Sequence, residues 1–220
     1  RSIPESIIWA LTVALSNHVT LLLPITEIYF QQNVITQVAS IILMDGVILL
    51  SVIAFFLELS TKKNLNLFAF IKNLFLNPFI LSIIIGLLFL LLNFNIDQTP
   101  IEYTLSKLAA CVSPVGLFAI GIILSFYTKN VINKLSISIS VLKLVISPII
   151  LLLIGLVFFN AGLPAEIPGA FFVSVAPCGV TSIVLCSAYN VSPENIIKAI
   201  FVSTIASIGT IFFAIKYLTL

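Results

Sequence analysis

Long apolar runs alternate with short polar clusters along nearly the whole chain. The runs cover residues 6–30, 34–59, 74–94, 103–127, 135–159, 169–189 and, after a Ser-Pro-Glu cap, 194–218. Each run holds about twenty or more residues, which is enough to cross the ~30 Å hydrocarbon core of a bilayer as an α-helix. The pattern therefore predicts an all-α integral membrane protein with about seven spanning helices.

Composition narrows the class of protein further. Hydrophobic residues make up 60% and charged residues 8% of the 220 positions, and the mean hydropathy is +1.26. A soluble domain normally carries about 25% charged residues, because its surface must face water. We therefore expect the lipid bilayer as the main partner. The net charge of +2 is too small and too scattered to indicate nucleic-acid binding.

Motifs for catalysis and metal binding are missing from the sequence. Cys111, Cys178 and Cys186 lie inside apolar runs without a CxxC pair, and the single histidine, His18, is far from them along the chain. No nucleophile motif, phosphate-binding glycine loop or HExxH pair is present. We expect neither an enzyme nor a metal or cofactor site, so any transport would have to be driven by a gradient.

Two of the seven runs are interrupted near their centres. Ser16-Asn17-His18 interrupts the first, and Pro177-Cys178-Gly179 interrupts the sixth. Inside a membrane, unpaired backbone groups are tolerated only where they meet protein or line a water-filled cavity. Simple packing kinks would also explain such residues. Two breaks five helices apart are better explained by related repeats that share a site, which requires the breaks to lie side by side.

Two ionisable residues lie close to these breaks or at the centre of a run. Asp45 lies mid-run, where a carboxylate costs about 3 kcal/mol on insertion scales and usually faces a cavity or a partner. It suits a proton carrier or a cation ligand, although a structural hydrogen bond to Asn17 or a serine is the alternative. Histidine is the side chain best suited to gain and lose a proton at physiological pH, so His18 is a second candidate for proton coupling. Lys143 is interpreted mainly as a side chain that extends to the cytoplasmic interface.

Four segments carry a recognisable set of motifs. They read ALSNHVTLLLPI at residues 14–25, NPFILSIIIG at 77–86, SPVGLFAIG at 113–121, and APCGV followed by AYNVSP within 176–193. Together they resemble the auxin efflux carrier family, including its bacterial malonate and other organic-acid permeases. The resemblance extends over essentially all 220 residues, and the last segment is the most specific. Ser16 departs from the pattern, because plant members have proline there.

The resemblance implies an inverted-repeat transporter of ten helices, of which this chain lacks the first three. Residues 1–60 would form the last two helices of the first repeat, 61–73 a cytoplasmic connection, and 74–220 the second five-helix repeat. In the family, the two broken helices cross and substrate binds beside the crossing. Carried over, the substrate-binding residues are Asn17, Asp45, Pro177, Cys178, Gly179 and Val180.

These expectations combine into one leading function. The protein would be a secondary active transporter, a permease or efflux carrier, that moves a small organic anion, with proton coupling through Asp45 or His18 left open. One alternative is a sodium-coupled symporter that resembles the bile-acid carriers. Another is a truncated, non-transporting membrane remnant. The short connection between residues 60 and 73 favours a bacterial-type permease in the inner membrane, and a homodimer remains an option.

The positive charges indicate how the chain is oriented. Assigning alternate connections to one side of the membrane gathers Arg1, Lys62, Lys63, Lys72, Lys129 and Lys134 there. Cytoplasmic connections carry an excess of lysine and arginine. The start of the chain is therefore expected in the cytoplasm and its end outside.

This orientation can be tested by cysteine labelling of sealed cells from outside. We expect a membrane-impermeant reagent to label Asp97→Cys and to leave Lys63→Cys and Lys129→Cys unlabelled, because only the connection around Asp97 would face the outside. Labelling of both lysine sites with Asp97→Cys protected would reverse the assignment.

Overall fold

The computed structural model describes residues 2–61, 67–127, 130–159 and 167–219, and within them it contains helices, turns and extended connections but no β-strand. The predicted all-α fold class is thereby confirmed. Four of the basic residues used for the orientation, Arg1, Lys62, Lys63 and Lys129, lie outside the described residues, so the orientation stays a prediction.

Most elements are α-helices, and three are short stretches of wider π-helix, in which an N–H donates to the carbonyl five residues earlier. The elements are α1 (Ile3–Ala14), η1 (His18–Leu22), α2 (Leu23–Tyr29), α3 (Gln32–Met44), η2 (Asp45–Leu49), α4 (Leu50–Thr61), α5 (Leu67–Phe75), α6 (Pro78–Leu91), α7 (Pro100–Ser125), α8 (Lys134–Val141), η3 (Leu142–Ile146), α9 (Ser147–Phe159), α10 (Pro168–Ser174), α11 (Thr181–Ala188) and α12 (Glu194–Leu218).

Within the described residues, four continuous helical segments are long and apolar enough to cross a membrane. They are Gln32–Thr61, Pro100–Ser125, Lys134–Phe159 and Glu194–Leu218. The first and sixth predicted runs instead form pairs of half-helices, α1 with η1 and α2, and α10 with α11. Each half is too short to span the bilayer alone, so the two halves of each pair must follow one another through it.

The third predicted run begins earlier than its hydropathy indicates. Helix α5 already starts at Leu67, inside the stretch predicted as a cytoplasmic connection, and a turn at Leu76 and Asn77 separates it from α6. Pro78 explains the separation, because a proline has no N–H to continue α5 but suits the first position of a new helix. The ring of Phe70 on α5 packs against Phe55 on α4 with 5.5 Å between ring centroids.

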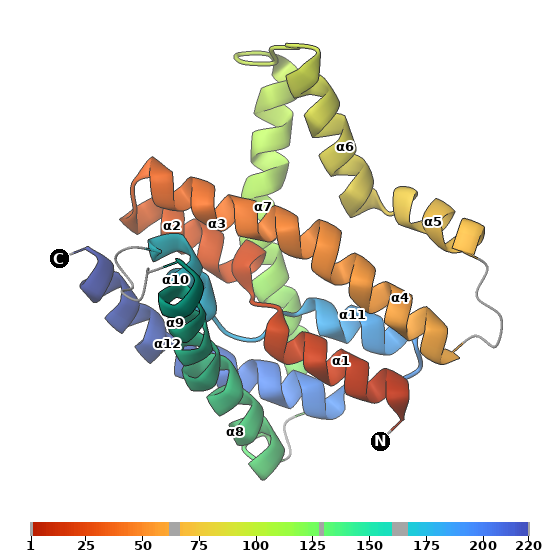
Figure 1. Ribbon diagram of the computed structural model, residues 1–220, viewed down its shortest axis with the longest axis vertical. Coiled ribbons are helices and arrows are strands. Elements are labelled where there is room, and N and C mark those ends of the chain that lie inside the picture. Colours follow the sequence, from red (N-terminus) through yellow and green to blue (C-terminus); the bar gives the residue numbers. More distant parts are fainter. Residues whose placement is uncertain (1, 62–66, 128–129, 160–166, 220) are drawn as a thin grey trace.

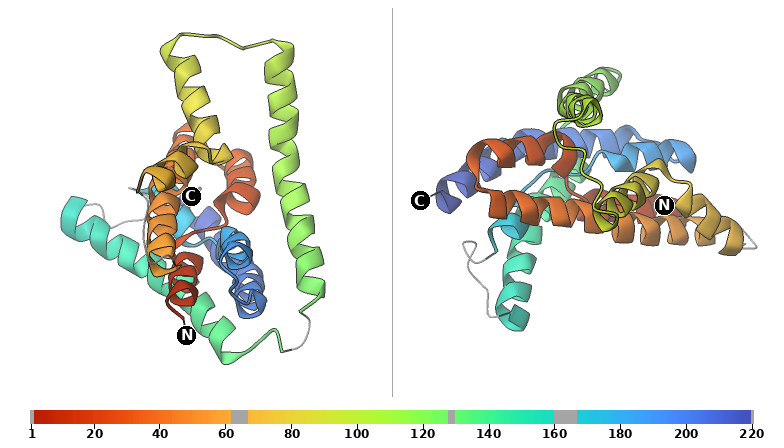
Figure 2. Two further views of the ribbon diagram at one scale, coloured as in Figure 1. Left: turned by 90° about the vertical axis from the view of Figure 1, so that its right-hand side faces the viewer. Right: turned by 90° about the horizontal axis from the view of Figure 1, so that it is seen from above.

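The helices form a main body with one projecting hairpin. Helices α6 and α7 extend away from the remaining helices and join at the top of Figure 1. A second view shows that the part of α7 nearer to α8 runs beside the body, whereas its other end projects beyond it together with α6 (Figure 2). No residue of α7 is buried, and the helix is anchored where Ser113 Oγ donates to the Thr20 carbonyl at 2.6 Å. The apolar surface of α7 is therefore available to lipid or to further protein.

The two broken helices cross at their breaks, near the centre of the body (Figure 1). The extended residues between α1 and η1 pair with those between α10 and α11 as a single antiparallel bridge, Ser16 with Cys178. The Asn17 N–H donates to the Pro177 carbonyl at 2.9 Å, and the Gly179 N–H donates to the Leu15 carbonyl at 2.7 Å. The sequence prediction that the breaks lie side by side is confirmed.

Hydroxyl side chains pair most of the other backbone groups that the breaks set free. Ser16 Oγ donates to the Val173 carbonyl at 2.9 Å, and the Cys178 N–H donates to Ser203 Oγ at 3.2 Å. Lipid offers no hydrogen-bond partner, so these bonds are what makes non-helical backbone stable at this depth. Ser16 supplies a donor that a proline at this position would lack.

Gly179 lets the two segments approach closely. A Cβ added there would lie 2.9 Å from Leu15 Cδ2 and 3.0 Å from the Leu15 carbonyl oxygen. Both distances are shorter than ordinary van der Waals contact, and the carbonyl oxygen is fixed by its hydrogen bond. A side chain at residue 179 must therefore push the two breaks apart.

We accordingly expect Gly179→Ala to destabilise the detergent-purified protein. Overpacking of about 1–3 kcal/mol predicts a melting temperature lower by roughly 2–10 °C. Gly209→Ala on α12 is the matched control, since no heavy atom lies within 4 Å of its added Cβ. Equal melting temperatures for the two variants would show that the close approach at the crossing does not matter for stability.

Candidate functional site

Three ionisable side chains gather around the crossing, and each one lies in a stretch of π-helix. His18 is the first residue of η1, Asp45 is the first residue of η2, and Lys143 is the second residue of η3. A π-helical turn holds an extra residue, which shifts the direction of the following side chains, and such turns occur frequently at functional sites. Three different helices thus direct one charged or titratable group each towards the same region.

His18 and Asp45 form a hydrogen bond across two helices. The His18 Nε2 and Asp45 Oδ2 atoms lie 3.0 Å apart, and the two side chains are 8% and 23% exposed. With Asp45 ionised, Nε2 must carry the shared hydrogen, which leaves Nδ1 as the position where an additional proton would bind. The pair brings together the two residues that the sequence singled out for proton coupling.

Asn17, which precedes η1, has a buried amide with a free donor. Its Oδ1 accepts a hydrogen bond from Thr20 Oγ1, so the side chain lies along its own half-helix. Its Nδ2 is buried and has no hydrogen-bond partner among the described residues. Leaving a buried amide donor unpaired costs about 1–3 kcal/mol. A ligand or water that accepts from Nδ2 would recover this free energy.

Lys143 is buried beside the crossing instead of extending to the interface. Its side chain is almost fully enclosed, and Nζ donates to the Ala14 carbonyl at 3.2 Å. The Asp45 carboxylate and the Cys178 thiol are close enough to interact with it electrostatically. The expectation that Lys143 extends to the interface is wrong. The distance of Lys143 from the end of its helix could have indicated this from the sequence. Lys143 lies nine residues after Lys134, or about 14 Å along the helix, further than a lysine side chain reaches.

The residues of the second break contribute mainly backbone groups, and few side-chain groups, to the candidate site. Pro177 and Cys178 are fully buried, and Gly179 packs against Leu15. Val180 is half-buried and precedes α11, whose first N–H groups have no partners within the helix. Binding of a substrate by these residues stays a prediction. Within the described residues, no three His, Cys, Asp or Glu side chains come together as metal ligands would.

A cavity of about 650 Å³ lies next to the first half-helix, between η1 and α2 on one side and α7 on the other. Its lining is mainly apolar, with the polar groups of Glu27, Ser106 and Ser113 among it. The size and the few polar groups suit a small organic molecule. Val19, which lines the cavity, is two residues beyond Asn17. Long-range packing of α7 creates this space, so it could not be predicted from the sequence.

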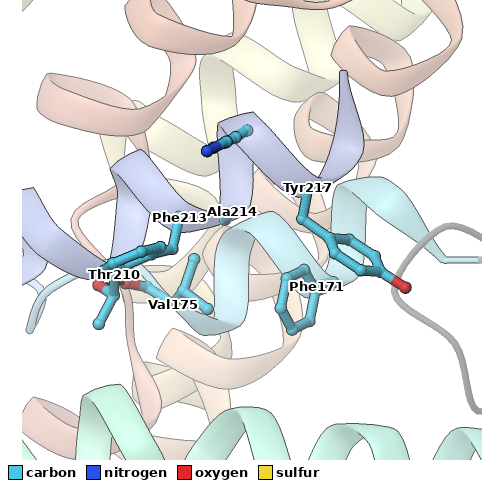
Figure 3. A pocket seen from close by; sticks show the side chains of 7 residues that line it. Phe171, Val175, Thr210, Phe213, Ala214 and Tyr217 are labelled. Carbon is cyan, nitrogen blue, oxygen red and sulfur yellow. Dashed lines mark hydrogen bonds between the residues drawn. The ribbon is translucent and has the colours of Figure 1, made fainter. Parts of the chain in front are cut away.

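A second hollow, of about 550 Å³, lies between α10 and α12 (Figure 3). Phe171, Val175, Phe213 and Tyr217 line it, and its polar groups are those of Thr210, Lys216 and Tyr217. Phe213 and Tyr217 are exposed on the outer side of α12. This groove suits an acyl chain of the surrounding bilayer, and none of the three ionisable residues at the crossing lines it.

Comparison with known proteins agrees with the geometry. The sequence model of a family described as membrane transport proteins, which includes the auxin efflux carriers, matches residues 1–215. No curated protein matches the sequence. The match extends over both broken helices and over the residues at their crossing. An all-α multi-pass architecture with four long apolar helices fits the same assignment. The chain therefore belongs to the membrane transport protein family.

Proposed function

We propose that this membrane transporter is a secondary carrier that moves a small organic anion, as in the organic-acid permeases of the auxin efflux carrier family, and couples its movement to protons. The anion would bind between the crossing and the cavity beside α7. The observation that carries the proposal is the buried, unpartnered Asn17 Nδ2 next to the His18–Asp45 pair. An acceptor-rich group such as a carboxylate is the natural complement of this donor.

The half-helix that begins at the crossing favours negative charge. η1 and α2 form a continuous helix from His18, and Asn17 makes no side-chain capping bond to its first N–H groups. Free N–H groups and the helix dipole together attract anions at such an end. Val180 and the start of α11 offer a second set of N–H groups across the crossing. Pro177, Cys178 and Gly179 would hold the two ends at a fixed separation.

The charges around the crossing suggest how a proton would be coupled. Asp45 contacts His18, and Lys143 interacts electrostatically with Asp45. With Asp45 ionised and Lys143 protonated, the cluster is neutral while His18 is neutral. A proton on His18 makes the cluster positive by one, which matches a monoanion. Binding of the anion and of the proton would then reinforce each other, because coupling between two sites is reciprocal. Anion uptake would then rise as the pH falls.

Two other functions remain as distinct outcomes of experiment. A sodium-coupled symporter would show uptake that depends on sodium at constant pH. A non-transporting membrane protein would show no uptake of any organic acid, although it folds and inserts. We place the carrier in a bacterial inner membrane, where a proton gradient would be available to drive it.

The substrate site can be tested with the full-length protein in proteoliposomes and a panel of radiolabelled mono- and dicarboxylates. We expect Asn17→Ala to lower the uptake efficiency of the best substrate by roughly tenfold or more, because a hydrogen bond to a charged group is lost. Asn195→Ala, at an exposed position near the start of α12, is the control and should transport normally. Wild-type uptake by Asn17→Ala would remove Asn17 from the site.

Proton coupling can be tested by measuring uptake between about pH 5.5 and 8, the range in which histidine titrates. The wild type should gain activity towards the acidic end, and His18→Gln and Asp45→Asn should show flat profiles. His18→Gln keeps a donor for Asp45 but cannot bind a proton. Asp97→Asn, an exposed carboxylate in the connection before α7, should keep the wild-type profile. If His18→Gln and Asp45→Asn both keep the wild-type pH profile, the His18–Asp45 pair has a structural role only.

A further inference from the structure

The last turn of α1 presents carbonyl oxygens to the crossing. The Leu11 carbonyl accepts the Leu15 N–H at 2.8 Å, and the Leu15 carbonyl accepts the Gly179 N–H at 2.7 Å. The Ala14 carbonyl, between them, accepts from the Lys143 ammonium. The C-terminal end of a half-helix carries partial negative charge, and such ends inside transporters commonly coordinate sodium ions or protons.

The charge distribution around Ala14 is that of a cation site. The Asp45 carboxylate interacts electrostatically with the Lys143 ammonium, and the Ala14 carbonyl binds it directly. The carbonyl oxygen is a ligand that a hard cation accepts, and the nearby carboxylate favours positive charge at this position. The ammonium is a compact point charge of the same sign and magnitude as a sodium ion.

We propose that Lys143 is a built-in cation that fills this site, so that the protein binds no sodium ion at the crossing. If the protein is a carrier, as proposed above, Lys143 is the residue that makes its transport independent of sodium. The occupation of the cation site by Lys143 does not itself depend on the proposed function. A buried lysine without a compensating role would be costly, since an apolar residue of the same size avoids the desolvation of a charge. Occupation of a cation site by Lys143 gives the charge such a role.

Removing the ammonium should convert the position into a sodium site. Lys143→Gln leaves the Ala14 carbonyl and the Asp45 carboxylate in place and adds an amide oxygen. Lys143→Ser leaves more space and a hydroxyl. In either variant the carboxylate loses its nearby positive charge, and a small cation from solution is the simplest replacement. Lys143→Arg keeps the charge and should not open the site.

The test is the melting temperature of the full-length protein in detergent, in sodium chloride and in choline chloride at equal ionic strength. The wild type and Lys143→Arg should melt at the same temperature in both salts. Lys143→Gln and Lys143→Ser should melt roughly 4 °C or more higher in sodium, because a ligand that binds only the folded state stabilises it. A variant that folds only in sodium supports the proposal equally.

Lys198→Gln is the matched control. Lys198 is also a buried lysine, but it pairs with Glu194 one turn earlier on α12, with 2.6 Å between Nζ and Oε1. Its removal should give equal melting temperatures in the two salts. A sodium-specific shift in Lys198→Gln would show that loss of any buried lysine produces the effect, which would overturn the assignment to the crossing.

Two further results would overturn the proposal. One is a sodium-specific stabilisation of the wild type, which would show that the ion binds with Lys143 in place. The other is a folded Lys143→Gln or Lys143→Ser that responds equally to sodium and choline. If neither neutral variant folds in any salt, the binding of radioactive sodium to the wild type is measured instead. Binding of sodium to the wild type contradicts the proposal, and the absence of binding supports it. No arm measures transport, so a failure to transport organic anions would overturn the proposed function alone.

Discussion

The direct hydrogen bonding of two non-helical segments is the constraint on which the rest of the molecule depends. The bonds from Asn17 to Pro177 and from Gly179 to Leu15 replace helical hydrogen bonds that the breaks remove. Lipid offers no partner for these backbone groups, so each broken helix is stabilised by the other. The crossing in turn fixes where α1 ends and η1 begins, and therefore where the Ala14 carbonyl and the His18 imidazole lie.

Stretches of π-helix adapt three helices to this crossing. The histidine, the aspartate and the lysine lie at or next to the start of η1, η2 and η3, respectively. An α-helix that continued without the extra residue would carry these side chains around to other directions. The local backbone irregularity and the charged cluster are thus one structural feature, in which apolar spanning helices position polar groups without losing their backbone hydrogen bonds.

The sequence predicted the parts of this arrangement that depend on local chemistry. Proline, glycine and asparagine at Asn17 and Pro177–Gly179 marked both breaks, and apolar length marked the helices. The π-helical stretches were not predictable, because one extra residue hardly changes the hydropathy of a run. The position of Lys143 was misread because its burial depends on the packing of α8 and η3 against α12. The cavity beside α7 likewise arises from contacts between residues far apart in sequence, such as Ser113 with Thr20.

The crossing also sets an order of events during synthesis. Ser16 and the carbonyl that it binds, that of Val173, are separated by 157 residues. At a synthesis rate of 5–20 residues per second, about 8 to 30 s elapse between them. During this time the peptide groups of the first break have no partner on their own chain, and lipid supplies none. The first broken helix therefore requires a polar or protein-lined environment until the second broken helix has been synthesised. Only then can the two pack against each other in the bilayer.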